Sequence, residues 1–534
     1  MPHSEEWVTW ESGNSRRKAD APLGEWGYPE QSSTRRVGLP ESWATRCADA
    51  GNNAGMNDQS SPRHALIVGA GLAGSLLACY LAEMGWRVDV FERRSDPRAK
   101  GYLGGRSINL ALSARGVWGL AGVGLDAHVL ERDAIPMRGR MIHPPGGGAT
   151  VFQPYSQDTN DAINSVSRGG LNLTLLEAAA AMPGVEFHFD QPCVDVDLDA
   201  CAAMIHQPGG TTTRVQADLV IGADGAFAPV RLRLIKNDRF EYSQSYLEHG
   251  YKELMIPAAA ELSEGALRGH SARDGFAMEP NALHIWPRGG AMMIALPNRD
   301  KSFTCTLFWP LDGEHGLTSL RTEDEVAAFF KQHYPDATPI MPTLVRDFRA
   351  NPNGSLVTVR CWPWQWGGKT VVIGDAAHAI VPFYGQGMNC AFEDCRVLAR
   401  CLSEHRDQRE ALEVFQAERK PNADAIADMA LENFTEMRDK VGDARFLYRK
   451  RVEQTLHRLH RDRVHPQYNL VSFSTVPYVE ARQSGRRLDA LLEKLIARLP
   501  MGSREELGDV AWEGKVSEIG GELLAKSEAP VGAS

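Results

Sequence analysis

The segment HALIVGAGLAGSLLACYLAEMGWRVDVFE, residues 64–92, decides the fold that we expect for this chain. It begins with a short apolar run, passes through a glycine-rich turn into a helical stretch that ends at Gly85, and closes with an alternating strand. A strand, a tight turn, a helix and a second strand in this order are typical of a βαβ unit, in which the two strands lie parallel. The segment therefore predicts an α/β fold built on a parallel sheet.

The turn has the spacing Gly-x-Gly-x-x-Gly, at Gly69, Gly71 and Gly74. Glycines at these positions permit a tight turn and let the backbone approach a pyrophosphate, whose charge meets the N-terminus of the helix. Glu92 ends the second strand eighteen residues after Gly74, where its carboxylate can accept hydrogen bonds from ribose hydroxyls. We therefore predict dinucleotide binding, with a tight turn that binds nothing as the alternative.

The composition excludes several classes of function. The chain has 534 residues, a formal net charge of −10 and no Lys/Arg-rich run, so nucleic acid is not an expected partner. Its nine cysteines form no Cys-x-x-Cys pair and no Cys/His zinc spacing, so we expect no metal site. Free cysteines fit the reducing cytoplasm, where we place the protein.

The sequence contains no convincing membrane anchor. The longest nearly apolar run, residues 65–82, is marginal in length and carries three glycines, so a strand, turn and helix explain it better than a membrane span. Near the C-terminus leucines recur at helical spacing between charged residues. This pattern predicts an amphipathic helix that packs on the protein, and we expect a soluble protein.

The rest of the chain divides into regions of different texture. Residues 1–62 are rich in Ser, Gly, Pro, Asn and charge without sustained periodicity, so we predict disorder or a spurious extension, with Met56 as the true start. Three β-rich runs between residues 281 and 310 predict adjacent antiparallel strands and therefore a second, sheet-based domain. Helical periodicity returns from Gly387 to about Lys440.

Two further motifs follow the glycine-rich turn. Asp224-Gly225 stands after one apolar strand, in ADLVIGADGAFAPVR, and Gly374-Asp375 stands after another, in TVVIGDAAH. The three motifs in this order resemble the aromatic hydroxylases, which are single-component flavin monooxygenases. The resemblance implies an extended FAD, with its pyrophosphate on the first turn and its ribityl hydroxyls on the Gly-Asp carboxylate.

The resemblance implies a p-hydroxybenzoate hydroxylase-type fold. That fold has a Rossmann-like FAD-binding domain, a second, mostly antiparallel β-sheet domain for the substrate, and here a C-terminal helical region. The expected boundaries are 63–136, 164–240 and 355–440 for the FAD-binding domain, 137–163 and 241–354 for the substrate domain, and 441–534 for the helical region.

Longer phrases narrow the resemblance to the kynurenine 3-monooxygenase family. They are FERRSDPR, GRSINLALSARG, MRGRMIH, HGYKEL, LHIWPRGGAMMIALPN, KSFTCTLF and VPFYGQGMN, spread over residues 64 to about 480. The chain resembles the bacterial members, which lack the C-terminal membrane anchor of the eukaryotic ones. The resemblance implies bound FAD, NADPH as co-substrate and O₂. It assigns cofactor contacts to Gly69, Gly71, Leu72, Ala73, Gly74, Glu92, Arg93, Arg168, Asp224, Asp375, Gly387, Met388 and Asn389.

The GQGMN segment has a physical role in this assignment. A helix that starts near Gly387 directs free N–H groups at the pyrimidine edge of the flavin, where the reduced ring is anionic. His378, in the preceding motif, is expected to be a packed structural residue rather than a base.

The family resemblance also implies the substrate. L-Kynurenine is an aniline with a ketone side chain and an amino-acid head, so its site needs a cation, polar groups and an apolar slot. The resemblance assigns the carboxylate to Arg140 and Tyr155, further polar contacts to Asn433 and Tyr468, and a wall of the slot to Phe383. Tyr384 departs from the His or Phe that we expect at this position in the family.

The implied reaction is hydroxylation of L-kynurenine to 3-hydroxy-L-kynurenine through a C4a-hydroperoxyflavin, a step of tryptophan degradation and of NAD biosynthesis. Because the flavin and the aniline nitrogen supply the chemistry, no catalytic side chain is expected. The alternative is a flavin monooxygenase or halogenase of the same fold that acts on another aromatic compound. A homodimer is one option for the assembly.

Overall fold

A six-stranded sheet forms the centre of the nucleotide-binding part in the computed structural model, which describes residues 62–100, 109–156, 158, 160–439 and 444–526. All of these residues belong to the compact unit Leu39–Ser534. Residues 1–61, for which we predicted disorder or a late start codon, lie outside the described residues.

The six strands lie in the order β18-β19-β12-β1-β2-β8. Every neighbouring pair is parallel except β18 with β19. Apart from His64 at the start of β1, the central strands β1 and β12 are apolar and buried, as expected when helices cover both faces of a parallel sheet. The strands are β1 (His64–Val68), β2 (Arg87–Phe91), β8 (Val185–His188), β12 (Leu219–Gly222), β18 (Gln365–Trp366) and β19 (Thr370–Val372).

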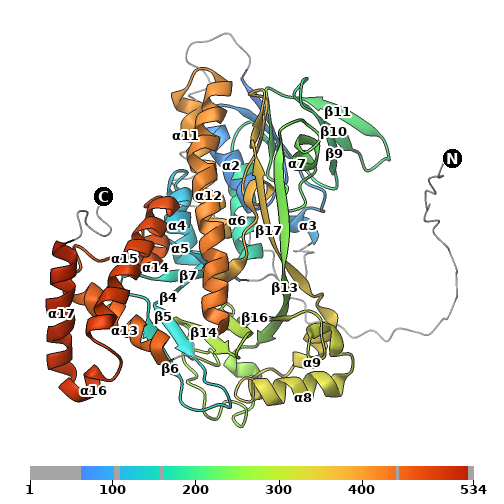
Figure 1. Cartoon of the computed structure of the whole chain (residues 1–534). Coiled ribbons are helices and arrows are strands. Elements are labelled where there is room, and N and C mark those ends of the chain that lie inside the picture. The colour runs from blue at the N-terminus through green and yellow to red at the C-terminus, as the bar shows by residue number, and fades with distance from the viewer. Residues whose placement is uncertain (1–61, 101–108, 157, 159, 440–443, 527–534) are drawn as a thin grey trace, which may run out of the picture. The chain divides into compact units, whose positions relative to one another are not determined.

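Helix α2 (Leu72–Glu83) follows the glycine-rich turn, so the predicted βαβ unit is confirmed. Helix α2 lies between α6 (Arg168–Ala180) and α11 (Gly387–Glu404), and α11 also packs on α4 (Ala114–Ala121) (Figure 1). The helix that opens with GQGMN is therefore next to the helix that opens with the glycine-rich turn, although more than three hundred residues separate them in sequence.

A second, seven-stranded sheet lies in the order β17-β13-β16-β15-β14-β5-β6 and is antiparallel except for the pair β14–β5. The three predicted strands between residues 281 and 310 are confirmed as antiparallel neighbours. The strands are β5 (Gly139–Ile142), β6 (Val151–Pro154), β13 (Glu241–Ile256), β14 (Ala282–Pro287), β15 (Met292–Pro297), β16 (Phe303–Pro310) and β17 (Gly354–Trp362). Strand β17, which the expected boundaries put with the FAD-binding part, pairs with β13.

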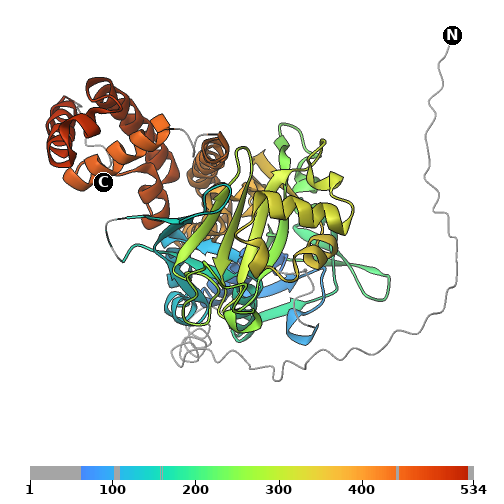
Figure 2. The ribbon, with the colours of Figure 1, turned by 90° about the horizontal axis from the view of Figure 1, so that it is seen from below.

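One face of the large sheet has a hydrophobic core of its own. Helices α8 (Glu323–His333) and α9 (Leu344–Ala350), yellow in Figure 2, lie over this face and contribute Phe330 and Phe348 to the core. Two three-stranded sheets complete the β-structure of the described residues. They are β3 (Asn109–Leu112), β7 (Ile163–Ser167) and β4 (Ala134–Met137), and β11 (Thr212–Gln216), β10 (Ala202–His206) and β9 (Cys193–Asp197).

The C-terminal part is helical, as the fold class predicted. Its elements are α12 (Gln408–Asp439), α13 (Ala444–Leu459), α14 (Gln467–Phe473), α15 (Tyr478–Arg498), α16 (Ser503–Leu507) and α17 (Asp509–Ala525). The regularly spaced leucines of α15 are buried against α13 and α17, so the predicted amphipathic helix packs on the protein. Among the described residues, no helix combines the length and the apolar composition needed to cross a membrane.

Two glycines of the first turn allow a test of what holds the βαβ unit together. A Cβ atom at Gly74 would lie 1.9 Å from the carbonyl oxygen of Gly69, so α2 would have to move away from the turn. We expect Gly74→Ala to lower the free energy of unfolding by roughly 2 kcal/mol or more, measured by urea denaturation of the protein without cofactor.

Gly71 is the matched control, because its φ is −76° and no atom lies within 4 Å of a Cβ built there. We expect Gly71→Ala to change the free energy of unfolding by no more than about 0.5 kcal/mol. Equal losses in the two variants would contradict the close packing of Gly74 on the turn.

Candidate active site

The glycine-rich turn holds its shape through backbone contacts. Gly69 has a φ of +105°, and its N–H donates to the carbonyl of Phe91 at 2.8 Å. The Glu92 carboxylate accepts from the backbone N–H of Ala70 at 3.0 Å and from that of Arg94 at 2.9 Å. These two bonds fix the carboxylate beside the start of α2, where no side chain caps the helix. The first N–H groups of α2 are thus placed to receive an anion.

A pocket opens in front of this turn. A Cβ at Gly71 would point into open space, which is the clearance that a bound pyrophosphate needs. Sequence reasoning missed Arg94, Ser95 and Asn172, although Arg94 and Ser95 directly follow the expected Arg93. The lining residues are Ala70, Gly71, Leu72, Glu92, Arg94, Ser95, Pro97, Arg168, Asn172, Leu176 and Phe189. The mixture of glycine, acid and arginine fits the phosphates and ribose of a dinucleotide.

Asp224, which follows the neighbouring strand β12, is half-buried, and its Oδ1 atom is buried. One carboxylate oxygen accepts from the N–H of Val230 at 3.2 Å, and the other has no partner among the described residues. Burial raises the pKa of this carboxyl to about 7, against the opposing effects of the Val230 bond and of the charges of Arg231 and Arg93. A buried oxygen without a donor marks a place where a hydroxyl of a bound molecule fits.

Gly374-Asp375 stands at the end of β19, as the motif predicted. Asp375 is exposed at the first position of the short helix α10 (Asp375–His378), and Gly374 has a φ of +56°. The N–H of Gly374 donates to the carboxylate of Asp394 on α11 at 3.0 Å. His378 also bonds Asp394, so the expectation that His378 is a packed residue agrees with its position.

The GQGMN turn is held by one side chain, that of Asn389. Its amide donates to the carbonyls of Ala111 and Gly385, both at 2.8 Å, and its oxygen accepts from the N–H of Ser113 at 2.9 Å. The Asn389 side chain is therefore engaged with the protein. It shapes the turn and leaves the N–H groups at the start of α11, where no side chain caps the helix, as the groups available to a cofactor.

Arg140 brings three distant segments together. It stands on β5, and its guanidinium carbon lies 4.7 Å from the ring centroid of Tyr468 on α14 and 5.5 Å from that of Tyr155 after β6. The two tyrosine rings stack with centroids 5.5 Å apart. Among the described residues, the Nε of Arg140 and the hydroxyl of Tyr155 have no hydrogen-bond partner although both are buried. The Arg140 side chain is half-buried, and a cation with a buried unused donor is suited to an anionic ligand.

Phe383 and Tyr384 connect the cluster of Arg140, Tyr155 and Tyr468 to the GQGMN turn. They form the short 3₁₀ helix η4 (Pro382–Tyr384), which runs directly into Gly385. The amide of Asn433 on α12 donates to the carbonyl of Phe383 at 2.7 Å, so at least this donor serves the backbone. The Tyr384 ring lies 5.7 Å from that of Tyr468, and burial raises the pKa of its hydroxyl, which therefore stays protonated. The cation pocket and the start of α11 are thus contiguous.

The chain matches known proteins along most of its length. The family described as FAD binding domain matches residues 63–430. Kynurenine 3-monooxygenase from Myxococcus xanthus is 48% identical over 442 residues, which are 83% of this chain and 92% of that protein. The enzyme of the same name from Dictyostelium discoideum is 46% identical over 80% of this chain and 92% of that protein. The one from Stenotrophomonas maltophilia is 43% identical over 86% of this chain and 96% of that protein.

Solved structures share the fold at lower identity. A tetrameric form of 2-methyl-3-hydroxypyridine-5-carboxylic acid oxygenase is 20% identical, with a TM-score of 0.59, and the match covers 72% of this chain and 94% of the other. A 2,6-dihydroxypyridine-3-hydroxylase from Arthrobacter nicotinovorans is 16% identical with a TM-score of 0.56, and the match covers 72% of this chain and 96% of the other. The expected hydroxylase fold is thereby confirmed. With matches of this identity over nearly the whole length of its relatives, the chain belongs to the kynurenine 3-monooxygenase family of FAD-binding proteins.

Proposed function

We propose that the protein is an FAD-dependent monooxygenase that converts L-kynurenine to 3-hydroxy-L-kynurenine with NADPH and O₂. The observation that supports the choice of substrate is the half-buried Arg140, whose buried Nε is an unused donor beside the rings of Tyr155 and Tyr468.

One long cofactor accounts for both glycine-rich turns. FAD would have its pyrophosphate at Gly69–Gly74 and the N-terminus of α2, and its ribityl chain near Asp375. Asp224 supplies a buried acceptor between these positions, and Arg168 supplies a positive charge in the first pocket. The start of α11 would face the pyrimidine edge of the ring, where the positive end of a helix stabilises negative charge.

When bound, FAD supplies the redox chemistry that takes electrons from NADPH and activates O₂. The Arg140 guanidinium holds the substrate carboxylate, and the protonated hydroxyls of Tyr155 and Tyr384 can donate to polar groups of the amino-acid head. Phe383 packs between Phe308 and Phe434, with ring centroids 5.0 and 4.4 Å apart, and forms an apolar wall for the aromatic ring of the substrate. The aniline nitrogen of the substrate activates the ring carbon beside it, so these residues need only orient the ring and exclude water.

We also propose that the protein is located in the cytoplasm. All eight cysteines that the structure describes are buried and free, which is the usual state in a reducing compartment. A homodimer is the assembly to be tested, by size-exclusion chromatography with light scattering.

The direct test measures NADPH and O₂ consumption with and without L-kynurenine and identifies the product by mass. We expect oxidation of NADPH to depend on kynurenine and the product to gain one oxygen atom. If the enzyme leaves kynurenine unchanged but rapidly hydroxylates another aromatic compound, the proposed substrate is wrong although the proposed type of reaction is right.

The Gly-Asp anchor can be tested through retention of the cofactor. Asp375→Ala removes a charged acceptor from the ribityl hydroxyls, a contact of about 1.5–3 kcal/mol, so the variant should release FAD on dilution. The measurement is flavin fluorescence of diluted holoenzyme. Asp238→Ala, at an exposed aspartate after α7 (Pro229–Leu234), is the control and should keep its flavin. An Asp375→Ala variant that stays as yellow as wild type would show that the anchor lies elsewhere.

Arg140 provides the test of the substrate pocket. Arg140→Ala leaves the substrate carboxylate unpaired in a partly dry pocket, so kynurenine should bind more weakly by roughly 2–5 kcal/mol, or about 30- to 3,000-fold. Arg140→Lys should restore binding only in part, because a point charge cannot reproduce the planar fork. FAD content should be unchanged in both variants.

Decarboxylated kynurenine is the matched ligand control for Arg140. It should bind wild type weakly and be almost indifferent to Arg140→Ala, since the contact that the substitution removes is already missing. If Arg140→Ala weakens binding of the acid and of its decarboxylated analogue equally, Arg140 supports the fold and does not hold the carboxylate.

A further inference from the structure

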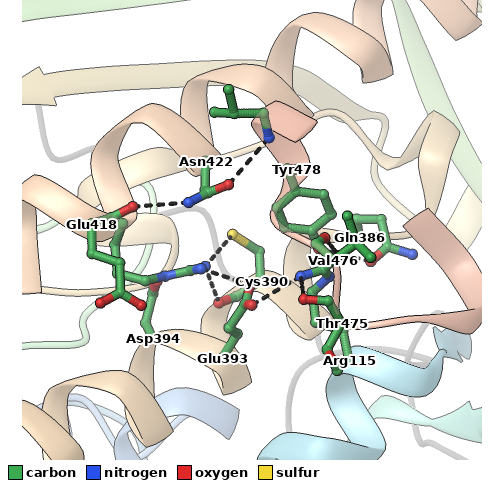
Figure 3. Close-up of polar contacts among 12 residues, drawn as sticks. Arg115, Gln386, Cys390, Glu393, Asp394, Glu418, Asn422, Thr475, Val476 and Tyr478 are labelled. Atoms are coloured by element: carbon green, nitrogen blue, oxygen red, sulfur yellow. Dashed lines mark hydrogen bonds and ion pairs between the residues drawn. The ribbon is translucent and has the colours of Figure 1, made fainter. Parts of the chain in front are cut away.

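A buried polar network joins the C-terminal helices to the start of α11. Its centre is Arg115 on α4, which is completely buried. One guanidinium nitrogen donates to Glu393 on α11 at 2.9 Å and to the carbonyl of Thr475 at 3.4 Å, and the other donates to the carbonyl of Val476 at 2.5 Å (Figure 3). Arg115 therefore binds two backbone carbonyl groups of the segment between α14 and α15 and holds that segment in place.

Tyr478, the first residue of α15, extends this network to the GQGMN turn. Its ring lies 3.8 Å from the guanidinium carbon of Arg115, a cation–π distance. Its hydroxyl donates to the side-chain oxygen of Gln386 at 2.9 Å (Figure 3). Burial raises the pKa of this hydroxyl, so it remains a donor at neutral pH.

Gln386 occupies the N-cap position of α11, immediately before Gly387. Its side-chain amide donates to the Ser113 hydroxyl at 3.3 Å, and the Ser113 N–H donates to Asn389. Asn389 in turn holds Gly385 and Ala111. Two residues, Gln386 and Ser113, thus link Tyr478 to Asn389, which shapes the turn.

The network contains more charge than packing alone requires. Arg419 on α12 forms ion pairs with Glu393 and Asp394, both at 2.7 Å, and all three side chains are buried. A buried ion pair often stabilises a fold no more than apolar side chains of the same volume would, because desolvation of the charges is costly. The role of these charges is therefore better explained by geometry, because each ion pair fixes the position of α11 relative to α12.

We propose that Tyr478 is a positioning residue for the flavin-binding turn: its hydroxyl, set by Arg115, orients Gln386 and thereby the N-terminus of α11. The same C-terminal segment carries Tyr468 of the substrate pocket ten residues earlier. The C-terminal helices therefore act on both the substrate pocket and the cofactor turn. This inference rests on the proposed binding of FAD at that turn.

Tyr478→Phe tests the proposal, because it removes one hydroxyl and leaves the ring on Arg115. We expect the bound flavin of the purified holoenzyme to show a shifted visible spectrum, and its dissociation constant for FAD to rise about three- to tenfold, as for the loss of one hydrogen bond. Both the spectrum and the dissociation constant report on the flavin site, and a loss of overall stability alone would change neither.

Tyr448→Phe is the matched control. Tyr448 on α13 is also buried, and its hydroxyl donates to the carbonyl of Leu499 at 2.7 Å within the C-terminal helices. We expect the two variants to lose similar thermal stability, with wild-type flavin spectrum and affinity in Tyr448→Phe. A wild-type flavin in Tyr478→Phe, or equal flavin changes in the two variants, would overturn the proposal.

Gln386→Met tests whether Tyr478 acts on the turn through Gln386. Methionine has nearly the volume of glutamine but can neither accept the bond from Tyr478 nor donate to Ser113. The single variant should therefore show at least the flavin change of Tyr478→Phe, and the double variant should show no change beyond that of Gln386→Met. Additive effects would show that Tyr478 does not act through Gln386. A wild-type protein that binds no FAD would instead refute the proposed function, and this inference with it.

Discussion

The carboxylate of Asp394 is the interaction on which the arrangement of this molecule depends. It accepts from the N–H of Gly374 at the end of β19, from His378 on α10 and from Arg419 on α12. The side chain is fully buried, and the surrounding donors lower its pKa in spite of the cost of burial. One carboxylate thus fixes α11 against the parallel sheet, the Gly-Asp turn and the long helix of the C-terminal part. A charge buried this deeply tolerates only a narrow geometry, because each donor must stay within hydrogen-bonding distance.

That constraint explains why the chain needs two glycine-rich turns. Helices α2 and α11 pack side by side and begin at turns that follow parallel strands of one sheet. Parallel strands end at the same edge, so ligands of such sheets bind there. A cofactor as long as FAD can then span both helix starts. The first turn offers N–H groups and arginine to phosphates, and the second offers a helix N-terminus to the ring.

The proposed substrate site depends on the same placement of α11. Residues 383 and 384 lie just before the turn, and the seven-stranded sheet supplies Phe308 and Arg140. Tyr468 comes from the C-terminal helices, which are held to α4 and α11 by the Arg115 network. The cation pocket is therefore a junction of three parts of the chain. The tyrosines of two of these parts lie over the half-buried Arg140, and a cation that is shielded from water attracts a carboxylate more strongly.

Much of the fold could be predicted from the sequence, because it depends on local patterns. Glycine spacing, strand alternation in residues 281–310 and the leucine period of α15 are each written in a short stretch of chain. The motifs and phrases of the family are local in the same sense, and they indicate the cofactor class by themselves. Local patterns could not show that the side chain of Asn389 bonds the protein, or that Arg94, Ser95 and Asn172 line the first pocket.

Contacts between distant residues were decided by the tertiary structure alone. Nothing in the sequence around Arg115 indicates that it holds the carbonyls of Thr475 and Val476, some 360 residues later. Nor does the sequence around Tyr478 point to Gln386. Hydrophobic periodicity specifies which face of an element is buried, but the partner of a buried polar group depends on which elements meet. The sequence by itself determined the elements, the cofactor class and the family, and packing decided which polar groups meet at the site.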